Sequence, residues 1–249
     1  MARAEAAQKS ADYYTIKEGT FRLKSTKDDP EAKARPYTNP KTKESGTAYE
    51  RVFKALYGVI EDVSFRETSL PDGTVLRSIN IDLGEDDNGT SVMVSTPQDS
   101  RFASDFLKKL PNIDLTKEVR LMPYDFEPKE GPRQVGLAVN HADPEGNFTI
   151  KVMDFFTKME EKNGEKTYTN LHGFPEATDE DKSDWPFYFK KVNKFLIKYA
   201  TEKILPRFAK NDTRSATEVF DQHNAKGDEA HNKAMDAAFD AIDPDSIPF

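Results

Sequence analysis

The end of the sequence has side chains that are suited to binding another protein. It reads Asp243-Pro244-Asp245-Ser246-Ile247-Pro248-Phe249. Phe249 offers a large apolar ring beside the terminal carboxylate, and this pair fits an apolar pocket with a basic rim. Pro248 restricts the backbone, which lowers the entropy lost on binding. Residues 228–249 also hold six acids and one base. The predicted partner-binding residues are Asp243, Asp245, Ile247, Pro248 and Phe249.

A second set of residues combines positive charge with flat rings. Single-stranded nucleic acid is held by a basic groove along its backbone and by aromatic side chains on which bases stack. Each aromatic residue, taken singly, is better explained as a core side chain. Tyr57 and Tyr124 are the stronger candidates, because a hydroxyl is awkward inside a small core. The predicted nucleic-acid-binding residues are Lys54, Tyr57, Arg77, Asn80, Met93, Arg120, Tyr124, Phe126, Lys129, Arg133, Arg35, Tyr37 and Lys41.

Motifs of common enzyme sites are absent from the sequence. There is no Gly-x-x-x-x-Gly-Lys phosphate loop, no Gly-x-Gly-x-x-Gly, no His-Glu-x-x-His and no Gly-x-Ser-x-Gly. Cysteine is absent, which excludes disulfides and thiolate chemistry. The four histidines, at positions 141, 172, 223 and 231, are too scattered to indicate a metal site. We expect a protein that is not an enzyme and uses no cofactor and no metal.

The net charge of −8 is unevenly distributed along the chain. Residues 1–54 hold twelve bases and eight acids, and residues 190–210 hold seven bases and one acid. Charges act over roughly 8–10 Å in physiological salt, so local patches govern binding more than the total does. The acidic total therefore does not exclude nucleic acid as a partner.

No segment has the apolar run of a signal peptide or a transmembrane helix. We expect a soluble protein of the cytoplasm, with no membrane partner. If a phage encodes it, the compartment is the host cytoplasm.

The elements that would position these candidates are mainly strands. Arg51–Arg66 reads as one long strand, and Gly58 inside it predicts a bulge or bend. Apolar residues then alternate with polar ones from Val75 to Leu83, as in a half-buried strand. Later segments add a strand, a helix ended by Pro111, and two more strands. These segments are Ser91–Thr96, Phe102–Leu110, Val119–Phe126 and Gln134–Asn140.

This order, β-β-β-α-β-β, is typical of an OB-fold, a five-stranded barrel whose long first strand bends between its two halves. We predict a mainly β protein with flanking helices (α+β) and an OB-fold core at residues 48–156. Residues 1–47 are predicted as an N-terminal segment with a basic arm from 24 to 47. Residues 157–227 form an extension with a basic amphipathic helix that begins at Trp185. Residues 228–249 form the acidic tail.

The ending of the chain resembles the tail of bacterial single-stranded-DNA-binding proteins, which close on Asp-Asp-Asp-Ile-Pro-Phe. Several phage proteins of this kind have a similar layout, with an OB-fold followed by an acidic tail ending in Phe. Here Pro244 and Ser246 interrupt the acidic run, and the motif covers only the tip. The resemblance implies sequence-nonspecific binding of single-stranded DNA in phage replication, recombination and repair. It also implies recruitment of replication or recombination proteins through the tip, and it leaves a homo-oligomer open.

Two other classes of protein remain open. One is an adaptor that displays the tip to host replication proteins without binding DNA. The other is a structural, virion-associated protein with an OB-like barrel. Binding to oligo-dT at modest salt is required only of the DNA-binding protein, so this measurement separates it from the other two classes.

Overall fold

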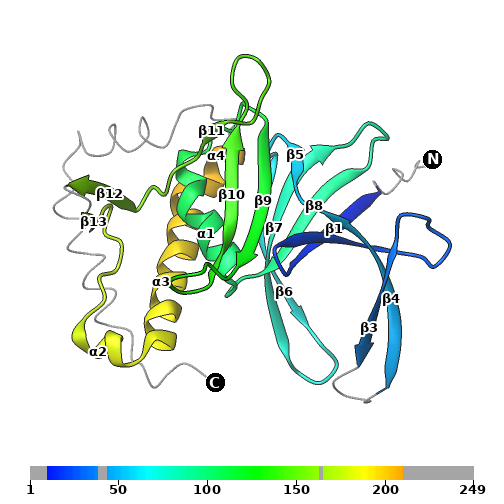
Figure 1. Ribbon diagram of the computed structural model, residues 1–249, viewed down its shortest axis with the longest axis horizontal. Coiled ribbons are helices and arrows are strands. Elements are labelled where there is room, and N and C mark those ends of the chain that lie inside the picture. Colours follow the sequence, from blue (N-terminus) through cyan, green and yellow to red (C-terminus); the bar gives the residue numbers. More distant parts are fainter. Residues whose placement is uncertain (1–9, 39–43, 163–164, 210–249) are drawn as a thin grey trace, which may run out of the picture.

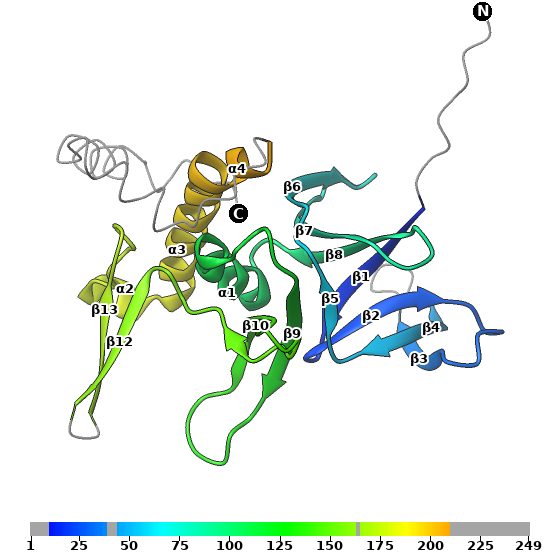
Figure 2. The same ribbon diagram turned by 90° about the horizontal axis from the view of Figure 1, so that it is seen from above.

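The computed structural model describes residues 10–38, 44–162 and 165–209. Figures 1 and 2 show their arrangement from two directions. In Figure 1 the two sheets lie in the centre and on the right, helices α1, α3 and α4 lie to their left, and strands β12 and β13 lie at the far left. Lys41 and the acidic tail predicted at 228–249, with its tip at 243–249, lie outside the described residues.

Strands make up most of the described chain. They are β1 (Ala11–Lys17), β2 (Thr20–Ser25), β3 (Lys33–Thr38), β4 (Ser45–Phe53), β5 (Leu56–Gly58), β6 (Asp62–Ser69), β7 (Val75–Glu85), β8 (Ser91–Pro97), β9 (Val119–Phe126), β10 (Gln134–His141), β11 (Ile150–Lys151), β12 (Thr157–Lys162) and β13 (Glu165–Asn170). The helices are α1 (Arg101–Lys109), the 3-10 turn η1 (Leu110–Asn112), α2 (Asp179–Ser183), α3 (Trp185–Tyr199), the π-helical turn η2 (Ala200–Ile204) and α4 (Leu205–Ala209). The prediction of a mainly β protein with flanking helices is confirmed.

The strands form two sheets and a separate hairpin. A seven-stranded sheet has the order β3-β4-β2-β1-β8-β7-β6, and a four-stranded sheet has the order β11-β10-β9-β5. Strands β12 and β13 pair only with each other. Neighbouring strands run antiparallel except β1 and β8, which run parallel.

The chain bends at Gly58, so that β5 lies in one sheet and β6 in the other. β5 pairs with β9 in the four-stranded sheet, and β6 pairs with β7 in the seven-stranded one. Gly58 has a φ of +156°, and a Cβ atom there would lie 2.3 Å from the backbone oxygen of Leu83. Only glycine fits this position, which confirms the predicted bend. The single strand expected from Arg51 to Arg66 is divided, since β4 ends at Phe53 and β6 begins at Asp62.

The five strands that correspond to the predicted barrel form an open ribbon, in the order β8-β7-β6/β5-β9-β10. A closed barrel would need β8 to pair with β10. Instead, β8 pairs with β1, and the edge of β10 meets α1 at Leu137 and β11 at Asn140 and His141. The Leu137 N–H donates to Asp105 Oδ2 at 2.7 Å, and the Leu137 carbonyl accepts from Lys109 Nζ at 2.8 Å. The sheets are therefore open and hold more strands than a five-stranded barrel.

One apolar core joins the sheets to the helices. The seven-stranded sheet contributes Ile79, Ile81 and Val94, the four-stranded sheet contributes Leu121 and Val139, and the helices contribute Phe106, Leu107, Phe195 and Leu196. Helix α1 begins and ends as predicted. Its N-terminus is capped by the Ser100 hydroxyl, which accepts from the Ala103 N–H, and Pro111 lies in the turn that follows it.

The flanking segments are more regular than the sequence predicted. The expected arm at residues 24–47 contains β3 and the start of β4 instead of a loop. Pro36 lies in β3, at the edge of the sheet, where a missing N–H is tolerated. Helix α3 begins at Trp185 as predicted, capped by Asp184.

Candidate nucleic-acid interface

The outer face of the four-stranded sheet gathers several of the predicted residues. Tyr57 of β5 lies opposite Arg120 of β9, and Arg120 lies opposite Asn140 of β10, which in turn lies opposite Lys151 of β11. Directly opposed residues point to the same side of a sheet. These four side chains therefore form one row across the sheet, away from the core residues Leu121 and Val139.

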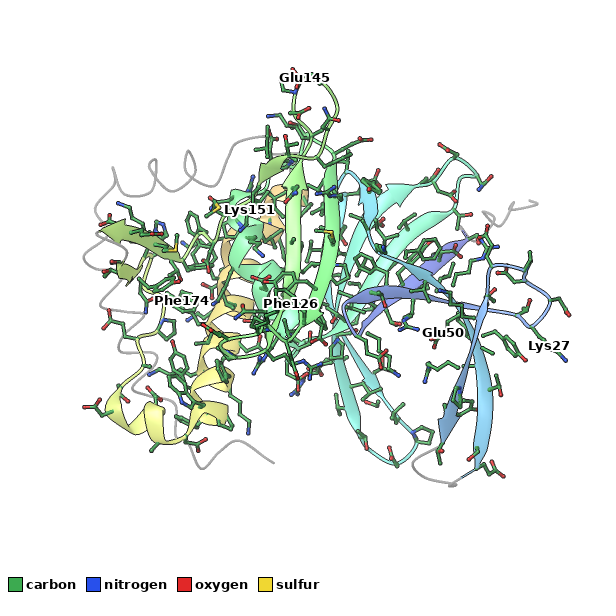
Figure 3. All side chains as sticks on the ribbon, viewed as in Figure 1. Lys27, Glu50, Phe126, Glu145, Lys151 and Phe174 are labelled. Carbon is green, nitrogen blue, oxygen red and sulfur yellow. The ribbon has the colours of Figure 1, made fainter. Side chains whose placement is uncertain are left out.

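The same face continues along β9. Side chains alternate in a strand, so Arg120, Met122, Tyr124 and Phe126 share this side. Tyr57 is 54% exposed and Phe126 is 53% exposed. Figure 3 shows Phe126 and Lys151 at opposite ends of the β9–β10 pair. From Arg120 to Phe126 the strand spans about 20 Å.

The outer face carries no carboxylate on its strands. Its outward positions are Tyr57, Arg120, Met122, Tyr124, Phe126, Gln134, Gly136, Ala138, Asn140 and Lys151. In a chain with 44 acidic residues this is an unusual surface. It combines two cations with exposed rings and is suited to a polyanion that has flat groups.

Arg120 differs from other arginines of the molecule. Arg35, Arg77 and Arg133 each form an ion pair with a carboxylate. Arg120 has no ion pair with a described residue, and its buried Nε atom lacks a hydrogen-bond partner there. A buried donor without a partner costs free energy until an acceptor reaches it. The Arg120 guanidinium group therefore holds a buried hydrogen-bond donor that no described residue satisfies.

The ring of Tyr57 is supported by a neighbouring loop. It meets Phe148 edge to face, with the ring centroids 5.0 Å apart. The Asn140 side chain donates to the Phe148 carbonyl at 3.0 Å, which ties the loop to β10. This arrangement leaves one side of the Tyr57 ring supported and much of the residue exposed.

The ring of Tyr124 is held by α1. Its hydroxyl donates to Asp105 Oδ2 at 3.2 Å, and the same oxygen accepts from Lys109 Nζ at 2.7 Å. Burial, together with the nearby Asp105 carboxylate, raises the pKa of Tyr124 to about 12. Gly136 makes room for the ring, because a Cβ atom there would lie 2.3 Å from the Tyr124 hydroxyl oxygen. The orientation of Tyr124 is thus fixed before any ligand binds.

Basic side chains flank this face. Lys54 is exposed between β4 and β5, and Lys129 is exposed in the loop that joins β9 to β10. Arg133, in the same loop, pairs with Asp125 through two contacts of 2.6 and 2.7 Å. Its pKa is raised by this hydrogen-bonded carboxylate. Lys54 and Lys129 are therefore the more available cations.

Arg77 and Met93 lie on the seven-stranded sheet, away from the row described above. Arg77 is exposed on β7, and its Nε lies 2.6 Å from Glu67 Oε1. Val75 and Leu76 beside it are also exposed, so this end of β7 faces solvent on both sides. Met93 is half-buried on β8, opposite Tyr13 of β1. The structure therefore does not bring Arg77 and Met93 to the outer face of the four-stranded sheet.

The expectation that Asn80 lies on an open face is wrong. Asn80 is 3% exposed and lies in a row with Ser64 and Ser95 of the neighbouring strands. Its Oδ1 atom is buried without a hydrogen-bond partner among the described residues. A polar type at an alternating position suggested an outward side chain, but this face of β7 is covered at Asn80.

Two candidates from the expected arm lie on β3. Arg35 makes a bidentate contact with Glu50, at 2.8 and 3.0 Å. This hydrogen bond lowers the pKa of Glu50. Tyr37 is exposed, and its ring lies over Gly46 of the neighbouring strand. Arg35 is thus already occupied, whereas Tyr37 remains accessible.

Several residues at or beside the outer face were missed from the sequence, among them Met122, Asn140, Phe148 and Lys151. Met122 could have been found, because it alternates with Arg120 and Tyr124. Phe148 and Lys151 reach the face through the loop after β10, and no local pattern indicates that register.

Within the described residues, no group of three or more His, Asp or Glu side chains is placed to hold a metal ion. No described helix combines the length and the apolar character needed to cross a membrane. Comparison of the chain with protein-family models, curated proteins and solved structures finds no match. Function must therefore be inferred from the chemistry of the surface.

Proposed function

We propose that this protein binds single-stranded DNA, without catalysis, on the outer face of the four-stranded sheet. The observation that carries the proposal is this sheet face, whose own strands carry no carboxylate and on which Arg120 and Lys151 lie among the rings of Tyr57, Tyr124 and Phe126. Bases would stack on Tyr57, Tyr124 and Phe126, and phosphates would meet Arg120, Lys151 and the flanking lysines. Stacking does not distinguish one base from another, so binding is expected to be nonspecific in sequence.

The strand order supports a relationship to the OB-fold. The ribbon β8-β7-β6/β5-β9-β10 has the predicted bent first strand, and α1 lies between its third and fourth strands. We take the core as an OB-like barrel that stays open, with β1 and α1 covering the edges that closure would join. In OB-folds oligonucleotides contact the face of strands 2 and 3 and the loops between strands 1 and 2 and between strands 4 and 5. The last of these corresponds here to the loop between β9 and β10, which carries Lys129 and Arg133 beside the proposed face.

Single strands are preferred over duplex for a physical reason. A base can lie on the Tyr57 or Tyr124 ring only when its own neighbours are unstacked. In a duplex the bases are paired and stacked, and the phosphates alone would contact the surface. The rings therefore add binding free energy only with single strands.

The acidic tail gives the proposed protein a second role. Through Ile247, Pro248 and Phe249 it would recruit replication or recombination proteins of a phage-infected cell. Deletion of residues 243–249 should leave the fold intact and abolish capture of such partners, with DNA binding unchanged or stronger. Phe249→Ala should reproduce most of the loss of capture, because the ring fills the partner's pocket.

The test of DNA binding is a titration with labelled oligo-dT and with duplex of equal length. Affinity should be higher for the single strand and should fall as salt rises, because bound phosphates release counterions. Equal affinity for both forms, or none for either at low salt, would contradict the proposal. The adaptor and the virion-associated protein would then be the remaining classes.

A further inference from the structure

The hairpin of β12 and β13 carries an apolar pair that is largely exposed. Met159 and Tyr168 lie directly opposite each other, and these residues are 47% and 63% exposed. Opposed side chains point to the same side of a sheet, so the two residues form one apolar patch. Figures 1 and 2 place the hairpin apart from both sheets. Because a ribbon of only two strands is marginally stable in water, this hairpin would gain stability from an added strand.

The outer edge of β12 is free among the described residues. β12 and β13 pair with each other and with no other described strand. In an antiparallel pair, every second residue directs its N–H and C=O groups away from the partner strand. The Thr157 N–H donates to Asp154 Oδ1 at 3.1 Å, so the edge that is open to a new strand begins after Thr157. Such an edge is a template for strand pairing.

Charges on β12 favour one way of pairing it with a second copy of itself. In an antiparallel pair of identical strands, the two-fold axis places one residue opposite itself. Among the four central residues of β12, an axis at Lys158, Glu160 or Glu161 would oppose like charges directly, which is unfavourable. An axis at Met159 opposes the two Met159 side chains instead. This register also places Lys158 of each copy opposite Glu160 of the other.

The side chains that this register would pair are accessible. Lys158 and Glu160 are 61% and 64% exposed, and they lie 2.7 Å apart within one chain. Each can therefore turn to a partner of opposite charge on a neighbouring strand. β13 offers no comparable match, because residues 167–170 carry no charge. Charge complementarity thus favours the edge of β12 over that of β13.

Pairing through β12 would also extend the apolar patch. Tyr168 and Met159 of one copy would continue into Met159 and Tyr168 of the second copy, in one row across four strands. Methionine sulfur packs favourably against aromatic rings. A four-stranded sheet with an apolar row is more stable than two separate ribbons.

We propose that two copies of this protein associate edge to edge through β12, in the antiparallel register centred on Met159. The contact involves one short strand of each copy, so association is weak and depends on protein concentration. The inference does not depend on DNA binding, since the hairpin is separate from the outer face of the four-stranded sheet.

Single cysteines test the register, because the chain contains no cysteine of its own. In full-length Met159→Cys, the thiols of the two copies would lie on opposed residues. The Cα atoms of such residues are about 4.5–5.5 Å apart, which is within the range of a disulfide. Mild oxidation with copper phenanthroline should therefore give a linked dimer on a non-reducing gel.

Tyr168→Cys is the matched control for this cross-link. Tyr168 is an exposed residue of the same apolar patch. In the proposed dimer, three strand spacings of about 14 Å in total would separate it from its counterpart in the second copy. This variant should cross-link more slowly, by about tenfold or more, because the distance exceeds the range of a disulfide.

Charge reversal tests the pairing of Lys158 with Glu160. Lys158→Glu and Glu160→Lys, each in the full-length protein, would place like charges opposite each other. Either variant should weaken self-association by about tenfold or more. An equal mixture of the two variants restores opposite charges at both contacts and should associate as tightly as the unaltered protein. Sedimentation velocity over a range of concentrations measures association, and circular dichroism checks that each variant is folded.

Four outcomes would overturn the proposal. The unaltered protein could remain monomeric at the highest concentration. The two cysteine variants could cross-link at the same rate, which would mean random collision. The charge variants could associate as well as the unaltered protein, or their mixture could associate no better than either variant alone. Oligo-dT titration of the same variants reports on DNA binding separately, so failure of one proposal is distinguishable from failure of the other.

Discussion

At the scale of single residues, the outer face depends on rings that are held in place from behind. Phe148 supports Tyr57, and Asp105 holds Tyr124. Rings fixed in this way lose little side-chain freedom when a base stacks on them, which favours binding. Variants of these rings therefore give the most direct test of the interface.

Tyr57→Ala should weaken oligo-dT binding by about 1–3 kcal/mol, the usual value of one stacked base. Tyr124→Ala should act similarly, whereas Tyr124→Phe should retain most affinity because the ring remains. Fluorescence anisotropy with labelled oligo-dT measures the change. Tyr168→Ala is the matched control, since Tyr168 is an exposed tyrosine on the separate β12–β13 hairpin. If Tyr57→Ala and the control bind alike, the stacking role is refuted.

Gly136→Ala should disturb Tyr124 without changing any ring. A methyl group at this position would lie 2.3 Å from both the Tyr124 hydroxyl oxygen and Asp105 Oδ2. The ring must move away, and the free energy of unfolding should fall by about 1–3 kcal/mol, as in an overpacked core. Urea denaturation measures the loss of stability, and oligo-dT binding should weaken in parallel. A folded variant with unchanged affinity would show that the orientation of Tyr124 is unimportant.

At the scale of elements, α1 contacts the edge of β10 at Leu137, where a closed barrel would place a strand. Asp105 accepts hydrogen bonds from the Leu137 N–H, the Tyr124 hydroxyl and Lys109 Nζ. This one carboxylate thus holds the edge of β10, orients the Tyr124 ring and pairs with the buried lysine. The Lys109 side chain is only 8% exposed. Loss of Asp105 would leave Lys109 and the Leu137 N–H without this acceptor.

Asp105→Ala should lower the free energy of unfolding by about 3 kcal/mol, because it leaves a buried charge without its partner. Urea denaturation followed by circular dichroism measures the effect. Glu160→Ala removes a carboxylate from the exposed pair with Lys158 and should change stability little. Similar losses in the two variants would mean that α1 does not hold the edge of β10.

The local sequence pattern correctly predicted those strands and helices whose signals lie within the element itself. The alternation from Val75 to Leu83 predicted β7, and Pro111 predicted the end of α1, because these signals act within one element. The same reasoning failed between residues 24 and 47. Prolines suggested a loop there, but β3 is an edge strand that tolerates Pro36 and is held by pairing with β4.

The candidate interface could be predicted only in part. Residue type alone selected Tyr57, Arg120, Tyr124 and Phe126, which the structure places on one face. Residue type also selected Asn80, which is buried, because polarity does not reveal what covers a strand. The open barrel could not be foreseen, since the partner of β8 is β1, far away in the sequence.

At the scale of the whole molecule, one buried and one half-buried histidine link stability to pH. Burial lowers the pKa of His141 and of His172. His141 Nε2 accepts from the Asp114 N–H at 3.1 Å, which requires that nitrogen to be unprotonated. His172 stacks on Phe155 with the ring centroids 4.0 Å apart. Both residues therefore favour the neutral form in the folded state.

The free energy of unfolding should decrease as the pH falls below about 6.5, the usual histidine pKa. In this range the two histidines bind protons in the unfolded chain but remain neutral in the folded chain. The stability present above pH 6.5 is therefore lost as the pH falls. Urea denaturation at pH 7.5 and pH 5.5 measures the difference. The variant His141→Gln with His172→Asn should show a smaller difference. Equal pH dependence in the two proteins would assign the effect to other groups.

The parallel pairing of β1 with β8 has a consequence for how the chain reaches its fold. Tyr14 lies opposite Val94, so β1 is synthesised well before β8, the strand 80 residues later with which it pairs. Closing so long a loop lowers the entropy of the chain before the strands make stabilising contacts. Nonlocal pairs of this kind therefore slow folding. During synthesis β1 can first join β2 and β4 as a local meander. The two halves of the large sheet would then meet in a late, rate-limiting step, and the edge of β8 would stay open to wrong partners until it occurs.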